Sequence, residues 1–379
     1  MNYIFRNTDV ILNNKDLEEL YTFENFPVFM GCTNDSSNTD IKAKMSWSIS
    51  KSSGIIQLNP LLPLEVVYGN GHGSGTVGKI WNEHHQAFAK FISKFNPSII
   101  LEIGGLHGVL ANKYLSIDKD INWTIIEPNP IIEDELPVDV IKGFFDEKFS
   151  SEKEFDTIIH SHVLEHIYDP KEFFDNKSKL MKVGNKLIFS VPNMKVMLEN
   201  NYNNCINFEH TLYLRSEYIE YFLKTYGFKM IEKEYFRNDH SIFYCAEKVD
   251  YEVNAKLNFD KLYSENRETF SKYIQSHLKE VSELNKKIED TDMPIYLFGA
   301  HIFAQYLIQF GLETNKIKYV LDNDIQKHGK RLYGTDLIVK SPKILEQERN
   351  ALVILKAGVY NKEVREDIIK NINSNIIFL

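Results

Sequence analysis

The sequence predicts an α/β fold with a parallel sheet at its centre, and three observations predict it. An apolar run from Ile99 to Ile103 ends at a glycine turn, and a helical segment begins near His107. A second apolar run, Trp123 to Ile126, ends in the acid Glu127. Strand-like and helical segments also alternate in the last part of the chain, from Pro294 onwards. Strands that alternate with helices in this way form parallel sheets.

The glycine turn between the first strand and its helix indicates a cofactor site. Gly104, Gly105 and Gly108 let the backbone approach a ligand without a Cβ clash. The helix N-terminus behind the turn offers free N–H groups. Glu127, at the tip of the next strand, is placed to accept hydrogen bonds from a ribose diol. The turn and the acid together predict a Rossmann-like core that binds a nucleoside-containing cofactor.

Three later segments narrow the class of cofactor. Residues 155–170 are a buried strand followed by a helix start, with Asp169 as the N-cap and Pro170 in the first helical position. Residues 186–193 are a further strand, and residues 224–236 are a helix end, a glycine and a strand. From Gly78 to Lys248 the chain resembles the class I S-adenosylmethionine (SAM)-dependent methyltransferases, in which the segment LEH, Leu164 to His166, is frequent.

The resemblance implies that SAM is the cofactor and that ten residues bind it. The family places the glycine turn beside the methionine part of SAM and the acid on the ribose. Leu106 stands where the family usually has another glycine. The implied cofactor-binding residues are Glu102, Gly104, Gly105, His107, Gly108, Glu127, Pro128, Asn129, Phe144 and Ser161.

The layout of the whole chain resembles a narrower family, the three-domain C-methyltransferases of nucleotide-linked sugars. We expect a small loop-rich N-terminal unit over residues 1–77, the SAM-binding domain over 78–250, and a connecting helix with a smaller Rossmann-like domain over 251–379. The helix is expected from about Asn258 to Glu289. In the last domain the resemblance rests on the GAH turn at 299–301, the LDND at 321–324 and the SP at 341–342.

The N-terminal unit departs from that family at its zinc site. The family carries C-x-x-C-G, whereas this chain has Ser50, Ser53 and Gly54 at the equivalent positions. A structural zinc site needs four Cys or His ligands, and Cys32 alone cannot supply them. We therefore expect the unit to fold without a metal, and the sequence predicts no metal ligand elsewhere.

The segment NFEHTLYL, residues 207–214, resembles the family's Y-x-E-H-L-x-Y, whose histidine is thought to act as the base. His210 and Glu209 match that motif, and Asn207 replaces its tyrosine. Histidine suits this role because it titrates near neutral pH. We expect His210, Glu209 and His162 to be catalytic and Tyr68, His72, Asn207 and His301 to bind substrate. Carbon and oxygen both remain open as the methyl acceptor, and the nitrogen of an amino sugar is the third candidate.

Composition restricts the partners. A formal net charge of -9 without a long basic run argues against a nucleic-acid partner. No apolar stretch approaches the ~20 residues that span a bilayer, and the first residues lack a signal-peptide profile. Three scattered cysteines fit a reducing cytoplasm. We expect a cytoplasmic enzyme that acts on a nucleotide sugar or glycan precursor. The sequence leaves the oligomeric state open.

Two alternatives remain from the sequence. The glycine turn and the acid also fit NAD, so an NAD-dependent oxidoreductase or epimerase is one alternative. A SAM-binding module that has lost activity is the other, because the zinc ligands are missing and Leu106 interrupts the glycine pattern.

Overall fold

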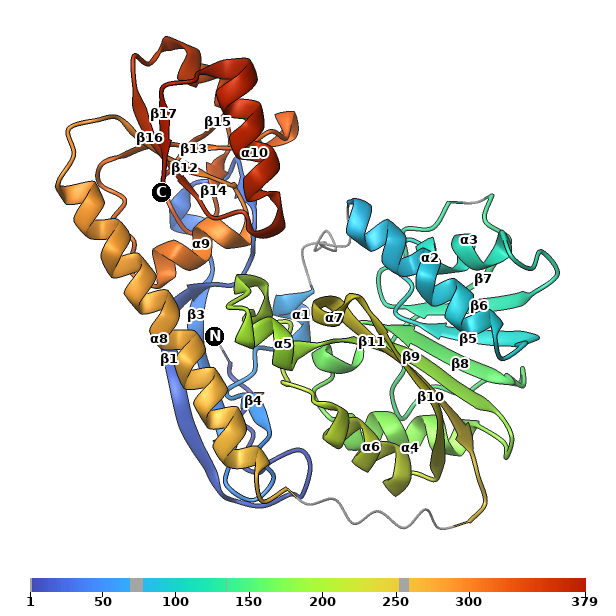
Figure 1. Ribbon diagram of the computed structural model, residues 1–379. Helices are drawn as coiled ribbons and strands as arrows, with labels where there is room; N and C mark the ends of the chain where they lie inside the picture. The colour runs from blue at the N-terminus through green and yellow to red at the C-terminus, as the bar shows by residue number, and fades with distance from the viewer. Residues whose placement is uncertain (1, 69–77, 134, 252–258) are drawn as a thin grey trace.

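The computed structural model describes residues 2–68, 78–133, 135–251 and 259–379. Figure 1 shows two bodies, a large sheet covered by helices and a second body that combines the two ends of the chain. Within the described part of the chain, no helix combines the length and apolar character needed to cross a membrane.

The larger body is built on a seven-stranded sheet with the order β10-β11-β9-β8-β5-β6-β7. Strands β5 to β9 pair parallel with one another, while β11 pairs antiparallel with both β9 and β10. The strands are β5 (Ile99–Ile103), β6 (Asn122–Glu127), β7 (Asp139–Lys142), β8 (Thr157–Ser161), β9 (Lys186–Pro192), β10 (Phe228–Phe236) and β11 (Ser241–Lys248). This is the Rossmann-like core that the sequence predicts.

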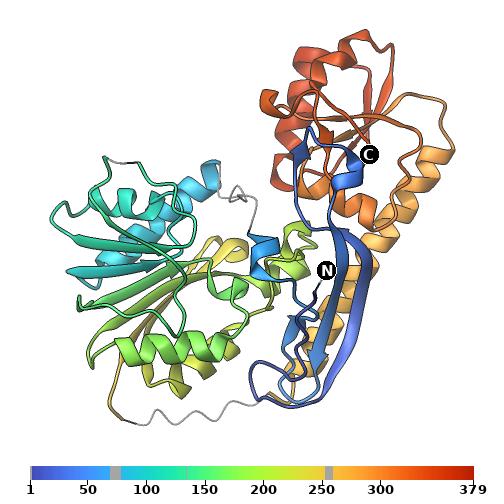
Figure 2. The same cartoon turned by 180° about the vertical axis from the view of Figure 1, so that it is seen from behind.

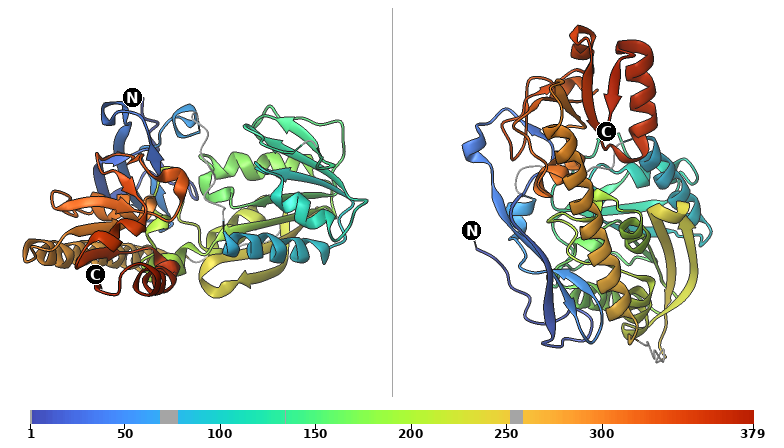
Figure 3. Two further views of the ribbon diagram at one scale, coloured as in Figure 1. Left: turned by 90° about the horizontal axis from the view of Figure 1, so that it is seen from above. Right: turned by 60° about the vertical axis from the view of Figure 1, so that its left-hand side comes forward.

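Helices cover both faces of this sheet, as Figures 1 and 3 show. α2 (Lys79–Ser93) and α3 (Val109–Leu115) pack on one face, and α4 (Pro170–Leu180) and α6 (Ser216–Thr225) on the other. The predicted start of α4 is confirmed, because the Asp169 carboxylate accepts hydrogen bonds from the N–H groups of Lys171 and Glu172. Burial on both faces explains why the parallel strands read as continuous apolar runs.

The second body joins the N-terminal unit to a long helix. β1 (Leu17–Pro27), β3 (Lys42–Ser50) and β4 (Ile56–Leu58) form an antiparallel sheet that lies along α8 (Leu262–Glu289), as Figures 2 and 3 show. Trp47 of β3 packs on Phe270 of α8, with ring centroids 6.3 Å apart. The predicted connecting helix is thus confirmed as α8. The N-terminal unit is dominated by a long hairpin rather than by loops, because β1 pairs with β3 along its length.

The C-terminal domain contains a parallel five-stranded sheet with the order β15-β13-β12-β16-β17. Its elements are β12 (Ile295–Phe298), α9 (Ile302–Gln309), β13 (Ile317–Leu321), β15 (Val339–Lys340), β16 (Ala351–Leu355), α10 (Asn361–Asp367) and β17 (Ile376–Phe378). The second Rossmann-like domain is therefore confirmed. It shares one apolar core with the N-terminal hairpin and α8.

Two short strands tie this domain to the N-terminal unit. β2 (Cys32–Thr33) pairs antiparallel with β14 (Arg331–Leu332). Beside this pair the Arg331 guanidinium donates two hydrogen bonds of 2.6 Å to the Asp40 carboxylate, and both side chains are less than a tenth exposed. A bidentate pair of this kind fixes the orientation of the two segments. The remaining short helices are α1 (Leu64–Val67), α5 (Met194–Glu199) and α7 (Arg237–His240).

One buried lysine in the core of the larger body is unusual. Lys177 of α4 is 0% exposed, and its Nζ lies 3.9 Å from the ring centroids of both Phe173 and Phe174. The same Nζ is 3.3 Å from Nε2 of the buried His160. Burial lowers the pKa of Lys177 well below its ordinary value. The folded protein therefore favours the neutral amine at this position.

Removing this amine should stabilise the protein. We expect Lys177→Met to raise the free energy of unfolding at pH 7 by about 1–3 kcal/mol, because a poorly solvated polar group is removed from the core. In the wild type the unfolded chain binds the proton that the folded amine loses. Wild-type stability should therefore rise as the pH approaches the unfolded lysine pKa of about 10.4, and the advantage of the variant should shrink.

Urea unfolding followed by circular dichroism at pH 7 and pH 9.5 measures this. Lys179→Met, at an exposed position of the same helix, is the control and should change stability little. A loss of stability in Lys177→Met at pH 7 would show that the amine is a required hydrogen-bonding group.

Candidate active site

The candidate site lies at the carboxyl edge of the parallel sheet. The strand order changes direction at β5, whose neighbours are β6 on one side and β8 on the other. In open α/β sheets ligands bind in the crevice outside this switch point. A cavity of about 2130 Å³ begins there and continues to residues of the N-terminal unit and of the C-terminal domain. The site is therefore enclosed by all three parts of the chain.

The glycine turn after β5 is closely packed against the sheet. Gly104 has φ +80° and its N–H donates to the Ile126 carbonyl at 2.9 Å. A Cβ on Gly104 would lie 2.7 Å from Cγ2 of Val163, and one on Gly105 would lie 2.8 Å from Cγ2 of Ile125. Both positions therefore require glycine. Gly108, with φ +62°, precedes α3 and does not line the cavity.

Two carboxyl groups stand on the strands beside this turn. Glu127 ends β6, and its Oε1 accepts the N–H of Asn129 at 3.0 Å. Glu102 of β5 accepts the indole N–H of Trp123 at 2.8 Å. Burial raises the pKa of Glu127, and it raises the pKa of Glu102 to about 7. Glu127 lies in the cavity wall, where its remaining acceptor sites can face a diol.

The structure brings nearly all of the predicted cofactor residues to this single cavity. Its wall includes Glu102, Gly104, Gly105, His107, Glu127, Pro128, Asn129, Phe144 and Ser161. Phe144 is 51% exposed at the rim, and Ser161 Oγ lies 2.9 Å from Ser190 Oγ. A tight glycine turn in the cavity wall, with an acid at the tip of the next strand, suits a nucleoside sulfonium such as SAM.

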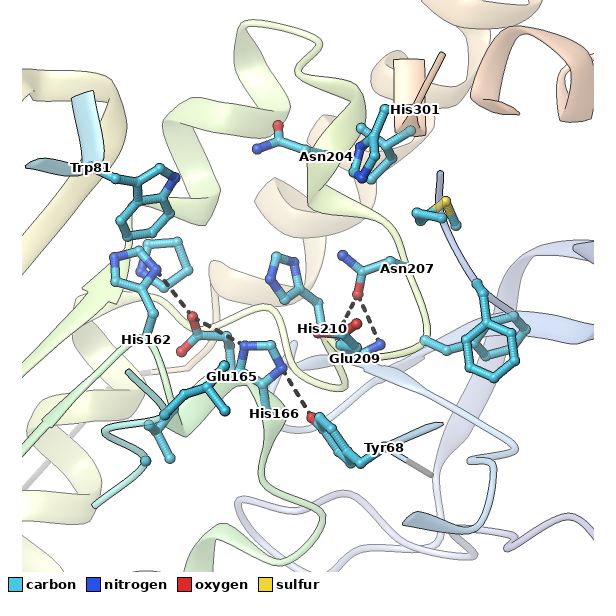
Figure 4. A pocket seen from close by; sticks show the side chains of 18 of the residues that line it. Tyr68, Trp81, His162, Glu165, His166, Asn204, Asn207, Glu209, His210 and His301 are labelled. Atoms are coloured by element: carbon cyan, nitrogen blue, oxygen red, sulfur yellow. Dashed lines mark hydrogen bonds and ion pairs between the residues drawn. The ribbon is translucent and has the colours of Figure 1, made fainter. Parts of the chain in front are cut away.

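A buried carboxylate organises the histidines next to the cofactor end. Glu165 is 0% exposed, and its Oε1 lies 3.3 Å from Nδ1 of His162 and 3.8 Å from Nε2 of His166. Nδ1 of His166 is in turn 3.4 Å from the Tyr68 hydroxyl, as Figure 4 shows. Burial raises the pKa of Glu165 and lowers the pKa of His166 to about 4. Neutral imidazoles are therefore favoured around this carboxylate.

His210 has a defined tautomer. Its Nδ1 lies 3.0 Å from the Cys205 carbonyl, and a carbonyl can only accept, so Nδ1 carries the hydrogen. The lone pair of the neutral ring is then on Nε2. Asn207 shapes the loop, because its Oδ1 accepts the N–H groups of Glu209 at 2.8 Å and His210 at 2.6 Å (Figure 4). The ring centroids of His210 and His166 are 5.1 Å apart.

The other predicted site residues are distributed over the same cavity. His162, Tyr68, Asn207, Glu209, His210 and His301 all line it. His301 precedes α9 at the far side, in the C-terminal domain. His72 lies outside the described residues. His162, Glu209 and His210, which the sequence predicts as catalytic, thus line one cavity, and His301 lines it from the C-terminal domain.

Sequence reasoning missed several residues of this wall. Glu165 belongs to the LEH segment, but that segment does not reveal that His162, His166 and His210 surround the carboxyl group. Trp81 and His240 have no motif, although each ring centroid lies within 6 Å of that of His162. The one available signal was the density of histidines in the chain.

Ser50, Ser53 and Gly54 lie in a hydrogen-bonded turn. Ser50 Oγ donates to Asp16 at 2.9 Å and accepts the N–H of Ser53 at 3.1 Å. The carbonyl of Ser53 accepts from the Tyr218 hydroxyl, and that of Gly54 accepts from the amide of Asn266 on α8. These bonds connect the turn to the helices that surround it.

Comparison with protein families gives two matches. Residues 80–233 match a family model described as a methyltransferase domain, and residues 240–378 match one described as a C-methyltransferase C-terminal domain. No curated protein matches the chain. Both matches favour a methyltransferase over an NAD-dependent oxidoreductase or epimerase.

Three solved structures of similar fold are distant from this chain. Human N-acetylserotonin methyltransferase in complex with SAM is 14% identical, with 45% of this chain and 52% of that chain covered and a TM-score of 0.39. The plantazolicin methyltransferase BpumL in complex with SAH is 11% identical, with 44% of this chain and 85% of that chain covered and a TM-score of 0.36. The N-methyltransferase NodS from Bradyrhizobium japonicum WM9 is 15% identical, with 46% of this chain and 98% of that chain covered and a TM-score of 0.33. This chain thus spans about half of the human enzyme, and we base no functional argument on these likenesses.

The two matched models and the fold lead to one assignment. The first model covers the sheet with the glycine turn and Glu127, and the second covers α8 and the C-terminal domain. The chain is therefore a class I SAM-dependent methyltransferase, and SAM is its cofactor.

Proposed function

We propose that this enzyme methylates a carbohydrate-like small molecule, a nucleotide-activated sugar or related glycan precursor, with His210 as general base. The observation that carries the proposal is that one cavity contains the cofactor residues at one end, Glu209 and His210 at its centre, and His301 at the other end. A methyl donor and an acceptor of extended shape can thus occupy it together, with the basic nitrogen between them.

The size of the cavity supports two ligands. Its volume of about 2130 Å³ is roughly twice the upper range of about 1,000 Å³ for pockets that hold one small ligand. The end away from the glycine turn has polar and aromatic walls from two units: Met30, Cys32, Thr33, Asp35, His301 and Tyr333. Walls of this composition suit an acceptor with hydroxyl groups and a flat ring.

The family model of the C-terminal domain favours carbon as the acceptor atom, since its description names C-methyltransferases. The Nε2 lone pair of His210 would accept a proton from a carbon next to a ketone. The electron pair left on that carbon would form the new bond to the methyl group, for which SAM supplies an activated methyl and a sulfide leaving group. Glu209 would orient His210 or bind substrate. Alignment in a site that excludes water would supply much of the rate.

Calorimetric titration tests the binding part of this proposal. We expect S-adenosylhomocysteine (SAH) to bind to the purified protein, and one nucleotide sugar of a panel to tighten that binding. Mass spectrometry and NMR of the product then distinguish a new C–CH₃ group from an O–CH₃ group. Absence of any tightening across the panel would contradict the proposed substrate class, and an O–CH₃ product would contradict the acceptor atom.

The role of His210 predicts a change in rate without a change in cofactor affinity. We expect His210→Gln to lower kcat by about 10²–10⁴-fold, the usual contribution of a general base, with SAH affinity unchanged. His328→Gln, in the C-terminal domain, is the control and should keep wild-type kcat. Full activity of His210→Gln would remove His210 from the base role.

The role of Glu127 predicts a loss of cofactor affinity when its carboxylate is removed. We expect Glu127→Ala to weaken SAH binding by about 10- to 100-fold, because it removes hydrogen bonds to a charged group. Glu133→Ala removes an exposed carboxylate from the following loop and should leave affinity unchanged. Equal losses in both variants would indicate a general charge effect rather than a contact of Glu127 with the ribose.

A further inference from the structure

Three histidines from separate elements meet behind the cavity wall. His84 is on α2, His162 follows β8, and His240 ends α7. Ring nitrogens of the three, one from each residue, all lie within 4.8 Å of one another. The mechanism proposed for methyl transfer uses neither His84 nor His240.

His84 is the member that lacks a hydrogen bond within the described part of the chain. Its side chain is 0% exposed, and neither Nδ1 nor Nε2 has a hydrogen-bond partner among the described residues. Phe88, Phe236 and Phe243 surround it, with ring centroids 5.3–6.1 Å from that of His84. An imidazole in such an aromatic pocket loses its hydration without compensation unless a ring nitrogen binds something.

The other two histidines are oriented by a common hydroxyl. Ser241 Oγ lies 2.6 Å from Nδ1 of His240 and 2.8 Å from Nε2 of His162. His240 therefore keeps Nε2 for another partner. Nδ1 of His162 lies 3.3 Å from Glu165 Oε1, so His162 would exchange one of its two contacts for the ion. Histidines that bind metals commonly use their second nitrogen for such an outer contact, which fixes the ring. His162 also has φ +53°, a strained conformation for a residue with a side chain, and this strain turns the chain at the end of β8.

We propose that His84, His162 and His240 bind a transition-metal ion of the Zn²⁺ type, with an open coordination position that faces the cavity. Three imidazoles without a carboxylate select Zn²⁺, Co²⁺, Ni²⁺ or Cu²⁺ over Mg²⁺ and Ca²⁺, which require oxygen ligands. His162 and His240 line the cavity while His84 lies behind them, so the free position faces inward. Three protein ligands and one open position are the pattern of a reactive zinc site.

The three imidazole nitrogens would need to move only a short way to bind one ion. Nitrogen ligands at about 2.0–2.1 Å from a tetrahedral ion lie about 3.3 Å from one another. The three nitrogens, now within 4.8 Å, would therefore approach by about 1.5 Å or less through side-chain rotation. The Trp81 ring, with centroid distances of 4.9 Å to both His162 and His240, covers the group. The sequence did not predict this site, because its ligands come from three distant segments.

A second group in the same cavity is the competing location. Glu165, His166 and His210 also place ligand atoms within 4.8 Å of one another. Both oxygens of Glu165 also lack a hydrogen bond within the described residues, but Oε1 has the imidazoles of His162 and His166 at 3.3 and 3.8 Å. Nδ1 of His210 bonds to the Cys205 carbonyl. His84 has aromatic and imidazole rings around it and no such bond within the described residues, so we place the ion at the three-histidine group. The test distinguishes the two locations.

Metal content and spectroscopy test the proposal on the full chain. Protein stripped with a chelator and titrated with Co²⁺ should bind one equivalent and show intense visible bands of a four-coordinate nitrogen site. Zn²⁺ should displace the Co²⁺ and raise the Tm of the stripped protein. Substoichiometric binding, or weak bands of a six-coordinate ion, would overturn the proposal.

Variants locate the ion. His84→Phe fits its aromatic surroundings, so the stripped variant should fold with a Tm at or above that of the stripped wild type, and it should lose the Co²⁺ bands and the Zn²⁺-dependent rise in Tm. His240→Gln should also lose the Co²⁺ bands and the Zn²⁺-dependent rise in Tm. If His84→Phe does not fold, these two measurements on His240→Gln test the proposal. His328→Gln should keep both. Full Co²⁺ binding in His84→Phe and His240→Gln, with loss in Glu165→Gln, would place the ion at the competing group and overturn the proposal.

Discussion

The parallel pairing of β5 with β6 and β8 is the constraint on which the site depends. Parallel strands end at the same edge of a sheet, so the glycine turn after β5, Glu127 at the end of β6 and His162 after β8 must meet there. The pairing itself depends on apolar burial, because helices cover both faces of the sheet. The local chemistry of the cofactor end therefore follows from the register of three strands.

The other end of the cavity depends on a different interaction, the apolar core shared by the N-terminal hairpin, α8 and the C-terminal domain. Residues close to both ends of the chain build one body in this way. The buried pair of Arg331 and Asp40 and the pairing of β2 with β14 fix the contact between the two units. The far wall of the cavity, which includes Cys32 and His301, is thus held by contacts outside the SAM-binding domain.

Burial of polar groups sets the chemical state of the cavity. Desolvation favours neutral imidazoles and raises the pKa of the carboxyl of Glu165 among them. Such an arrangement is costly for folding, and buried polar clusters of this kind are commonly kept for function. His210 differs from its neighbours because a backbone carbonyl fixes its tautomer and leaves one nitrogen as an acceptor. Base chemistry at His210 and ligand binding at His84 would use separate parts of one histidine-rich wall.

Local patterns in the sequence predicted elements and motifs. Apolar runs that end in glycine or in an acid predicted β5, β6 and the cofactor turn, and the capping pair Asp169-Pro170 predicted the start of α4. Those features are local, since hydrophobic period and backbone conformation depend on neighbouring residues. The packing of the hairpin on α8, the place of Glu165 among histidines and the contact of His84 with His240 became visible in the three-dimensional fold alone. These contacts join residues far apart in the chain, and they depend on side-chain packing that no local pattern encodes.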